Sequence, residues 1–228
     1  MQRILEPELM DDPLQAAAYA AADFSEPHGL FIKKFQEVFF GTNITGQVLD
    51  LGCGPADISI RFARTYPACH IYGVEGSPAM LLEGKAALVR TGLQQQVELI
   101  QGLIPGVELP QRKYQVILSN SLVHHLHDPS VLWKFIKKYS DVDTLICIMD
   151  LMRPGTPREA RELVNTYCGT EPQILRQDFY NSLCAALCPQ EVKLQLEDAG
   201  LQELTLDIIS DRHWMVSGII KMHNYSAY

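Results

Sequence analysis

Short apolar runs alternate with longer amphipathic segments along most of this 228-residue chain. The short runs stop at glycine or polar residues, as strands do, and predict seven strands at 47–51, 69–74, 97–101, 114–120, 143–150, 204–209 and 214–221. The longer segments carry apolar residues at helical spacing and predict helices at 55–66, 77–91, 129–139 and 189–199. Because strands alternate with helices, the pattern indicates crossover connections and an α/β fold with a mainly parallel sheet.

The last two predicted strands differ from the others because only residues 210–213 lie between them. This connection is too short for a crossover helix, so the pair must be antiparallel. We therefore expect a seven-stranded, mostly parallel sheet with an antiparallel last strand. Ser77 is expected to cap one helix at its start, and Gly92 and Gly200 are expected to end two helices.

Two segments fall outside this alternation, although the whole chain, 1–228, is expected to be a single domain. The predicted division is a helical N-terminal cap at 1–45, a core at 46–150, a lid insertion at 151–188, and the last helix with two strands at 189–228. Helical stretches are expected around 15–24 and 28–39. The insertion follows the fifth strand at the carboxyl edge of the sheet, where ligands bind in such folds. The alternative for both segments is that they only pack against the core and have no part in ligand binding.

Composition narrows the classes of protein that this chain could be. Apolar residues at 47% and charged residues at 20% are typical of a globular chain. The formal net charge of −8 makes nucleic acid a poor partner, since phosphates need a basic face. No apolar run reaches the roughly 18–20 residues of a membrane span, and the N-terminus lacks a signal-peptide core. Six cysteines without a disulfide-scaffold pattern indicate free thiols in a cytoplasmic protein.

The strongest local signal is the turn LDLGCGP at 49–55, which joins a strand to a helix. Gly52 and Gly54 let backbone amides approach a ligand closely, and the helix start behind them offers unpaired N–H groups. A dinucleotide fingerprint would place a third glycine where Asp57 stands. Asp50, at the end of the strand, would repel a pyrophosphate and would suit a cationic ligand.

A second carboxylate supports the same interpretation. Glu75 ends the second strand 25 residues after Asp50, the spacing of an acid that binds ribose hydroxyls. The two acids together predict a ligand with a ribose, a positive group and no phosphate. S-adenosylmethionine (SAM) fits this description, whereas the nicotinamide dinucleotide of an oxidoreductase does not.

Three stretches, VLDLGCGPADIS, YGVEGSPAML and VILSNSLVHHLHD, resemble motifs I, II and IV of class I SAM-dependent methyltransferases. The resemblance covers roughly residues 46–150. It implies a three-layer, Rossmann-like methyltransferase fold, with which the reversed last strand agrees. It also implies SAM as the cofactor and S-adenosylhomocysteine (SAH) as its product, but it does not specify the acceptor.

The same resemblance assigns cofactor roles by position. The residues expected at the cofactor are Asp50, Gly52, Cys53, Gly54, Glu75, Gly76, Ser77, Met80, Gly102, Leu103, Asn120 and Ser121. Asp50 would neighbour the methionine amino group, and Glu75 would take the ribose hydroxyls. Ser77 and Met80 would border the adenine, and Asn120 would face the methionyl end.

Methyl transfer from a sulfonium is an in-line displacement on an activated carbon, so the protein mainly supplies alignment. A base is needed only when the nucleophile must lose a proton. The stretch after the fourth strand resembles the L-H-x-W-x-D stretch of plant-type O-methyltransferases, which places His124 on the general base and Asp128 on the acid. A structural histidine is the alternative, because H-H-x-x-D also occurs in methyltransferases without a catalytic histidine.

The candidate acceptor contacts are Tyr19, His125, Arg153, Tyr180 and Asn181. A buried stripe of Phe179, Leu183 and Ala186 would leave Tyr180 and Asn181 free to face a ligand. The arginine could meet an anionic acceptor, and the tyrosine near the N-terminus lies in an alanine-rich helix suited to closing over a cofactor. Helix packing or a solvated surface is the alternative for each. No metal is predicted, because nothing in the sequence holds Cys184 and Cys188, the possible second ligand pair of a zinc site, beside the clustered histidines.

We therefore expect methyl transfer to a small-molecule acceptor. The acidic balance and the cap segments favour this acceptor class, and the segment SNSLVHHL lacks the N-P-P-Y type of motif that clamps a nucleic-acid base. The alternatives are another SAM-using enzyme, such as a cyclase or isomerase, and a non-catalytic binding or scaffold protein on the same fold.

Overall fold

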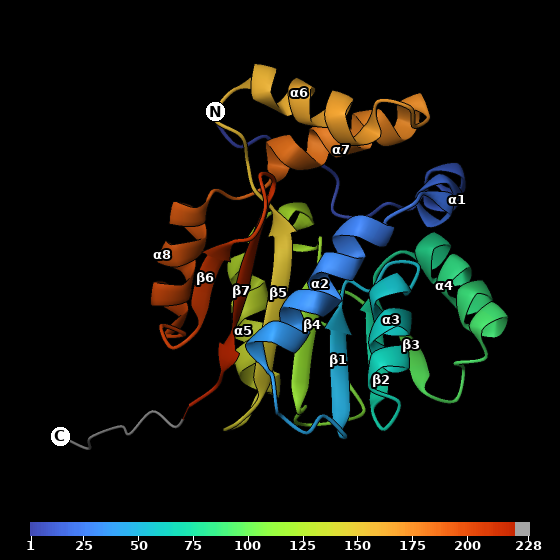
Figure 1. Ribbon diagram of the computed structural model, residues 1–228, viewed down its shortest axis with the longest axis vertical. Helices are drawn as coiled ribbons and strands as arrows, with labels where there is room; N and C mark the ends of the chain where they lie inside the picture. Colours follow the sequence, from blue (N-terminus) through green and yellow to red (C-terminus); the bar gives the residue numbers. More distant parts are fainter. Residues whose placement is uncertain (222–228) are drawn as a thin grey trace.

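The computed structural model describes residues 1–221 as a central sheet with helices on both faces (Figure 1). Within these residues, seven strands stand in the order β3-β2-β1-β4-β5-β7-β6. They are β1 (Gln47–Leu51), β2 (His70–Glu75), β3 (Val97–Gln101), β4 (Val116–Asn120), β5 (Leu145–Leu151), β6 (Thr205–Ile208) and β7 (His213–Ile219). Strands β1 to β5 are parallel, and β7 pairs antiparallel with both β5 and β6. The predicted fold class and the reversed strand are confirmed.

Two apolar cores, one on each face of the sheet, give the molecule its three layers. The helices of the described residues are α1 (Pro13–Ala21), α2 (Ser25–Val38), α3 (Asp57–Thr65), α4 (Pro78–Thr91), η1 (Val123–His125), α5 (Ser130–Tyr139), α6 (Pro157–Cys168), α7 (Gln173–Ala185) and α8 (Pro189–Ala199). Neighbouring residues of a strand point to opposite faces. Val48 packs with Phe35 of α2 on one face, and Leu49 packs with Trp133 of α5 on the other.

Left-handed backbone shortens two of the predicted elements. The helix expected from residue 55 begins at Asp57, because Gly54 and Ala56 have φ of +52° and +67°. The strand expected from residue 143 begins at Leu145, because Asp143 has φ of +69° and belongs to a turn. A residue in this region cannot continue a regular helix or strand.

The predicted helix caps are present. The Ser77 hydroxyl accepts a hydrogen bond from the Met80 N–H at 3.1 Å, which satisfies one free donor at the start of α4. Gly92 and Gly200 adopt left-handed φ of +72° and +66° and end α4 and α8. Asp12 caps α1, so this helix begins earlier than expected.

The chain's polar strand ends gather at one edge of the sheet. Strands β1, β2 and β4 are parallel, so their carboxyl ends meet there and bring Asp50, Glu75 and Asn120 together. Strand β7 runs the opposite way and begins at this edge, where His213 pairs in register with Leu151. The edge therefore collects groups from both directions of the sheet.

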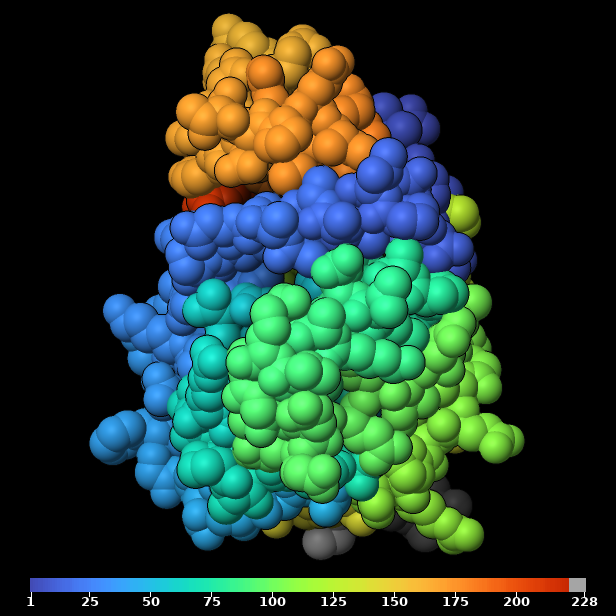
Figure 2. All heavy atoms as spheres, turned by 90° about the vertical axis from the view of Figure 1, so that its right-hand side faces the viewer, coloured from blue at the N-terminus to red at the C-terminus, as the bar shows by residue number. Residues whose placement is uncertain are grey.

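Two segments cover this edge. Helices α6 and α7, the lid helices, share an apolar core that includes Val164 and Leu183, and they form the insertion expected at 151–188. Residues 1–12, the N-terminal segment, reach the lid helices through the Ile4 N–H, which donates to the Cys184 carbonyl at 3.0 Å. Figure 2 shows N-terminal residues in blue as a band between the orange lid helices and the cyan and green core.

No helix within residues 1–221 combines the length and the apolar character needed to cross a bilayer. All six cysteines are free thiols, as expected. The end of the predicted region 189–228 lies outside the described residues from 222 onward.

Candidate active site

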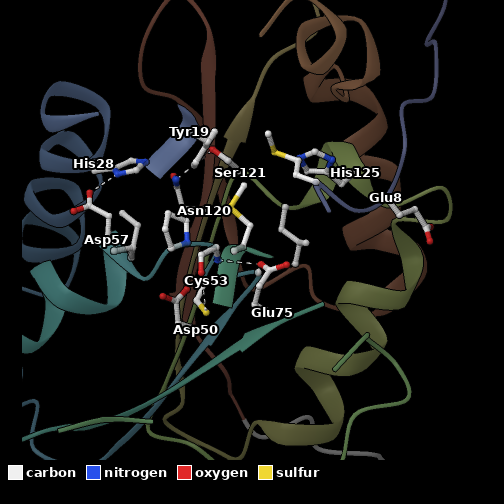
Figure 3. Close-up of a pocket in the computed structure, with 17 residues that line it drawn as sticks. Glu8, Tyr19, His28, Asp50, Cys53, Asp57, Glu75, Asn120, Ser121 and His125 are labelled. Atoms are coloured by element: carbon white, nitrogen blue, oxygen red, sulfur yellow. Dashed lines mark hydrogen bonds and ion pairs between the residues drawn. The ribbon is translucent and has the colours of Figure 1, made fainter. Parts of the chain in front are cut away.

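The turn after β1 contains two glycines with positive φ, on either side of Cys53, which Figure 3 shows near Glu75. Gly52 has φ of +69°, and a Cβ there would meet the Leu122 side chain at 2.8 Å, so a larger residue is strained. The Gly54 N–H donates to Glu75 Oε2 at 3.0 Å, and the Ser77 N–H donates to Glu75 Oε1 at 2.8 Å. The Glu75 carboxylate is therefore held in one position beside the glycine turn.

Asp50 is a buried acid for which residues 1–221 provide no counter-charge. Its side chain is 1% exposed, and the Ser59 hydroxyl donates to Oδ2 at 2.6 Å. Burial, with a smaller contribution from nearby Glu75, raises the pKa of Asp50 to about 7 against the opposing effect of the Ser59 hydrogen bond. A cationic ligand group beside Asp50 would supply the missing charge.

Strand β4 ends in a second unsatisfied group. The Asn120 Oδ1 atom is buried and accepts no hydrogen bond within the described residues, while the Asn120 amide nitrogen donates to the Ser121 hydroxyl at 3.2 Å. Buried polar groups almost always have a partner. The Asn120 oxygen is therefore positioned to accept a hydrogen bond from a ligand.

A narrow cavity of about 80 Å³ runs over these groups. Figure 3 shows Asp50, Cys53, Glu75 and Asn120 around it. The predicted cofactor residues that line it are Asp50, Gly52, Cys53, Gly54, Glu75, Met80, Asn120 and Ser121. The other predicted cofactor residues, Gly76, Ser77, Gly102 and Leu103, are not in its lining.

The N-terminal segment accounts for that difference at Gly76 and Ser77. A Cβ at Gly76 would meet Leu9 at 2.7 Å and Leu103 at 2.6 Å, so these leucines fill the space above the glycine. The Ser77 hydroxyl donates to the Met10 carbonyl at 2.8 Å. The edge that would border adenine is thus covered by residues of the chain's own N-terminus, a placement that no sequence pattern predicted.

A large cavity of about 540 Å³ adjoins the narrow one, between the strand ends, α1, α2 and the lid helices. Both cavities are lined by Met10, Tyr19, His28, Asn120 and Ser121. The two spaces meet at these five residues. A ligand in the narrow cavity and a second ligand in the large cavity would therefore face each other here.

His124, the predicted base, is held between two acids. Its side chain is 3% exposed, with Nδ1 2.5 Å from Asp150 Oδ1 and Nε2 3.6 Å from Glu6 Oε1. Burial lowers the pKa of His124, but the charges of Asp150 and Glu6 and the Asp150 hydrogen bond outweigh burial and raise it overall. This environment favours the imidazolium, which has no lone pair to accept a proton.

His28 of α2 forms a different pair, which the sequence analysis missed. Its Nδ1 lies 2.5 Å from Asp57 Oδ2, and the Arg61 Nε donates to the same oxygen at 2.7 Å. Burial raises the pKa of Asp57, but these bonds to His28 and Arg61 outweigh burial and lower it. The Nε2 of His28 has no hydrogen-bond partner in the described residues, and the ring lines both cavities. The one signal for this pair in the sequence was Asp57 itself, an acid at the position where a dinucleotide fingerprint would have its third glycine.

His213 presents a neutral donor to the large cavity. The Ser210 hydroxyl oxygen accepts the N–H groups of Arg212 at 3.2 Å and His213 at 3.0 Å, which uses both of its lone pairs. Its own O–H therefore donates to His213 Nδ1, 2.9 Å away, and the ring proton lies on Nε2. Burial, followed by the charge of Arg212, lowers the pKa of His213 to about 4.

The predicted acceptor contacts are only partly brought together. Tyr19 lines both cavities, and His125 lines the narrow one. Burial, followed by the neighbouring His124, lowers the pKa of His125 to about 3. Arg153 lines neither cavity: its side chain is 8% exposed and pairs with Glu191 at 2.6 Å, at the start of α8. This arginine therefore holds two elements together and does not face an acceptor.

The predicted orientation of α7, with Tyr180 and Asn181 facing a ligand, needs correction as well. Tyr180 packs against the core of the lid helices, and the Asn181 side chain accepts a hydrogen bond from Gln177 at 2.8 Å on the exposed face. The α7 residues that line the large cavity are Leu175, Asp178, Phe179 and Ser182. Helix α7 contacts both α6 and the cavity, so its inward face is wider than the single stripe predicted from the sequence.

Comparison with known proteins supports the resemblance. Residues 48–142 match a family model described as a methyltransferase domain. A release factor glutamine methyltransferase of Gloeobacter violaceus is 36% identical over 32% of this chain and 26% of its own length. Protein arginine N-methyltransferase 1 of Schizosaccharomyces pombe is 30% identical over 55% of this chain and 32% of its own length. The chain thus spans less than half the length of these relatives.

Two solved structures share the fold over most of the chain. A SAM-dependent methyltransferase from Aquifex aeolicus has a TM-score of 0.64 at 18% identity, covering 90% of this chain and 97% of its own. The plantazolicin methyltransferase BpumL, solved with SAH and a plantazolicin analogue, has a TM-score of 0.68 at 14% identity, covering 91% of both chains. At these identities the likeness establishes the fold.

Proposed function

We propose that this chain, whose residues 48–142 match a methyltransferase domain, is a class I SAM-dependent methyltransferase that transfers a methyl group to a small molecule held in the large cavity. The observation that supports this proposal is the junction of the two cavities at Tyr19, His28 and Asn120. A cavity of about 540 Å³ has the size of a small-molecule site, for which roughly 300–1,000 Å³ is usual. A protein side chain would have to pass the lid helices to reach the same junction.

SAM, the cofactor of this family, supplies an electrophilic methyl group. The chain's own groups fit such a ligand, because the buried Asp50 carboxylate lacks a cation and the buried Asn120 oxygen lacks a donor. In this proposal Asp50 binds the amino group and Glu75 binds the ribose hydroxyls. Both acids are fixed by hydrogen bonds from the chain, which reduces the entropy lost on binding.

The N-terminal segment would move to admit the adenine. The narrow cavity, at about 80 Å³, is smaller than the usual ligand site of roughly 300–1,000 Å³. Leu9 and Met10 occupy the edge beside Gly76 and Ser77. We propose that this segment lifts from α4 and closes again over the bound cofactor.

We further propose that His28, rather than His124, is the base when the acceptor must lose a proton. With Nδ1–H donated to Asp57, the Nε2 atom of His28 carries a lone pair at the junction of the cavities. His124 has a carboxylate beside each ring nitrogen and serves to fix η1, whose Val123 N–H also donates to Asp150 at 2.5 Å.

The acceptor class can be tested with methyl-labelled SAM and a cell extract separated into small-molecule and protein fractions. We expect label in the small-molecule fraction, and no labelling with Asp50→Asn. Label confined to protein would overturn the proposed acceptor class.

The base can then be tested with the labelled fraction as acceptor. His28→Gln should lower kcat by about 10²–10⁴-fold, the usual contribution of general base catalysis, with SAH affinity unchanged. His124→Gln is the matched comparison, and its kcat should fall less. A rate for His28→Gln equal to that of the unmodified protein would remove His28 as the base.

A further inference from the structure

The charged groups of the large cavity are predominantly acidic. Its acids are Asp23, Glu26, Glu171 and Asp178, and its only arginine among the described residues is Arg212. Glu26 pairs with Arg212, but the four acids outnumber this one arginine, so the space has a negative potential that attracts cations and repels anions.

The single arginine is not available to an anionic ligand. The Arg212 guanidinium is 7% exposed and pairs with Glu26 at 2.7 Å and Asp211 at 3.2 Å. The Tyr167 ring covers it at 3.4 Å from the ring centroid. The two carboxylates therefore neutralise its charge, and the tyrosine ring covers one face of the guanidinium plane.

The histidines of the large cavity do not supply a free positive charge either. His124 faces Asp150 and Glu6, and His28 faces Asp57. His213 is a neutral ring, buried at the start of β7, and its Nδ1 accepts a hydrogen bond from the Ser210 hydroxyl. An acidic ligand in this cavity would therefore meet no unpaired cation among residues 1–221.

Two buried oxygens that line the cavity lack hydrogen-bond donors. Asp178 Oδ2 is inaccessible to solvent and unpaired in the described residues, and so is Oδ1 of Asn120, whose side chain is more than nine-tenths buried. Such groups normally have a partner. Asn120 lines both cavities and its oxygen is assigned above to the cofactor, so Asp178 is the unpaired oxygen left for an acceptor, and a cationic N–H donor would both satisfy and neutralise it.

Aromatic rings form the apolar part of the wall. Tyr19 and Phe24 lie 4.6 Å apart between ring centroids, and Phe179 lines the cavity from α7. Aromatic faces bind apolar bodies and also attract cations. The aromatic wall and the acidic side chains thus favour a molecule that has an apolar body and a positive charge.

Resting on the proposed function, we infer that the acceptor is an apolar, ring-sized molecule that carries a protonated amine and no acidic group, with Asp178 pairing the ammonium. A carboxylate on the same body would be excluded by the four acids and by the absence of an unpaired cation in the described lining.

Three probes with the same ring test this inference: indole-3-ethylamine, indole-3-ethanol and indole-3-acetate, each titrated by calorimetry into SAH-saturated protein. The amine should bind at least about tenfold more tightly than the alcohol, as expected for a charged hydrogen bond, and the acetate should bind most weakly. In Asp178→Asn the amine should lose its advantage over the alcohol, while alcohol binding persists as evidence of an intact cavity. Asp198→Asn, an exposed acid on α8, is the matched control and should keep the preference.

The outcomes separate this inference from the proposed function. If SAH binds but the acetate equals or exceeds the amine, or no probe binds, the inference is overturned and the proposed function stands. An unchanged amine preference in Asp178→Asn also overturns it. If SAH itself does not bind, the proposed function fails first.

Discussion

At the residue scale, the proposed contact between Asp50 and the cofactor's amino group predicts that cofactor binding depends on pH. Burial raises the pKa of Asp50 to about 7 in the ligand-free protein. A cationic amino group needs the ionised carboxylate, so a proton competes with the ligand below that pH. SAH affinity should therefore fall as pH falls through 7, by about fivefold between pH 7 and pH 6 and by close to tenfold for each further pH unit.

Calorimetry at pH 6, 7 and 8 measures this dependence. Asp50→Asn should bind SAH more weakly, with an affinity that no longer changes over this range. Equal affinities at pH 6 and 8 in the unmodified protein would place the amino group away from Asp50.

Gly52 is a second residue with a defined requirement. Its φ of +69° and the contact of 2.8 Å between an added Cβ and Leu122 make Gly52→Ala strained and crowded. The left-handed backbone alone costs about 1–2 kcal/mol of the free energy of unfolding, and displacement of the turn should also weaken SAH binding. Gly92→Ala is the control, because it has φ of +72° in open space away from the site.

Urea unfolding and SAH titration separate the two glycines. Both variants should lose stability, but only Gly52→Ala should lose SAH affinity. Unchanged SAH binding in Gly52→Ala would show that the turn does not contact the cofactor.

Residues at strand ends were predictable, and residues that meet only in tertiary structure were not. Asp50 and Glu75 end parallel strands, so the sequence places their backbones at one edge. His28 lies 29 residues before Asp57 in a helix without a motif, and their contact depends on how α2 packs against α3. His124 illustrates the converse, because its motif is recognisable while Glu6, which changes its chemistry, comes from the N-terminal segment.

At the element scale, one side chain of the N-terminal segment, Arg3, adds three hydrogen bonds to those that hold this segment on the lid helices and near η1. The Arg3 guanidinium donates to the carbonyls of Ala185 at 2.6 Å, Leu126 at 2.9 Å and His124 at 3.2 Å. Arg3→Ala removes all three bonds and should let the segment open more often. Hydrogen exchange at the Ile4 amide should become at least about tenfold faster, since each lost bond is worth about 1 kcal/mol.

Arg158→Ala is the control for this experiment, because Arg158 is an exposed arginine of α6 with only a neighbouring Glu162 as partner. Its Ile4 exchange should match that of the unmodified protein. An Ile4 amide that exchanges at the same rate in Arg3→Ala would mean that other contacts hold the segment.

The periodicity of apolar residues predicted which segments are helices and which are strands. It did not always predict which face of a helix is buried. The seven strands and core helices occur close to their predicted positions, since each buries an apolar face against the sheet. Helix α7 contacts two surfaces, and Phe179 both packs against the lid core and lines the large cavity. A single apolar stripe predicted from the sequence could not distinguish burial against the lid core from burial at the large cavity.

At the scale of the whole molecule, the candidate site forms because segments from distant parts of the chain cover one edge of the sheet. The sheet brings Asp50, Glu75 and Asn120 together, the N-terminal segment and α1 cover them, and the lid helices enclose the large cavity. Sequence patterns predict the sheet and its edge, but the enclosure depends on contacts between residues more than a hundred positions apart, such as Ile4 with Cys184.

The central claim is that SAM binds in the narrow cavity on Glu75, and calorimetric titration of SAH tests it most directly. Glu75→Gln should bind SAH about 10–100-fold more weakly, because a charged hydrogen-bond acceptor for the ribose is lost. Asp198→Asn, an exposed acid of α8, should bind as the unmodified protein does. Thermal unfolding of both variants establishes that each is folded. If folded Glu75→Gln binds SAH with unchanged affinity, the account of this site is contradicted.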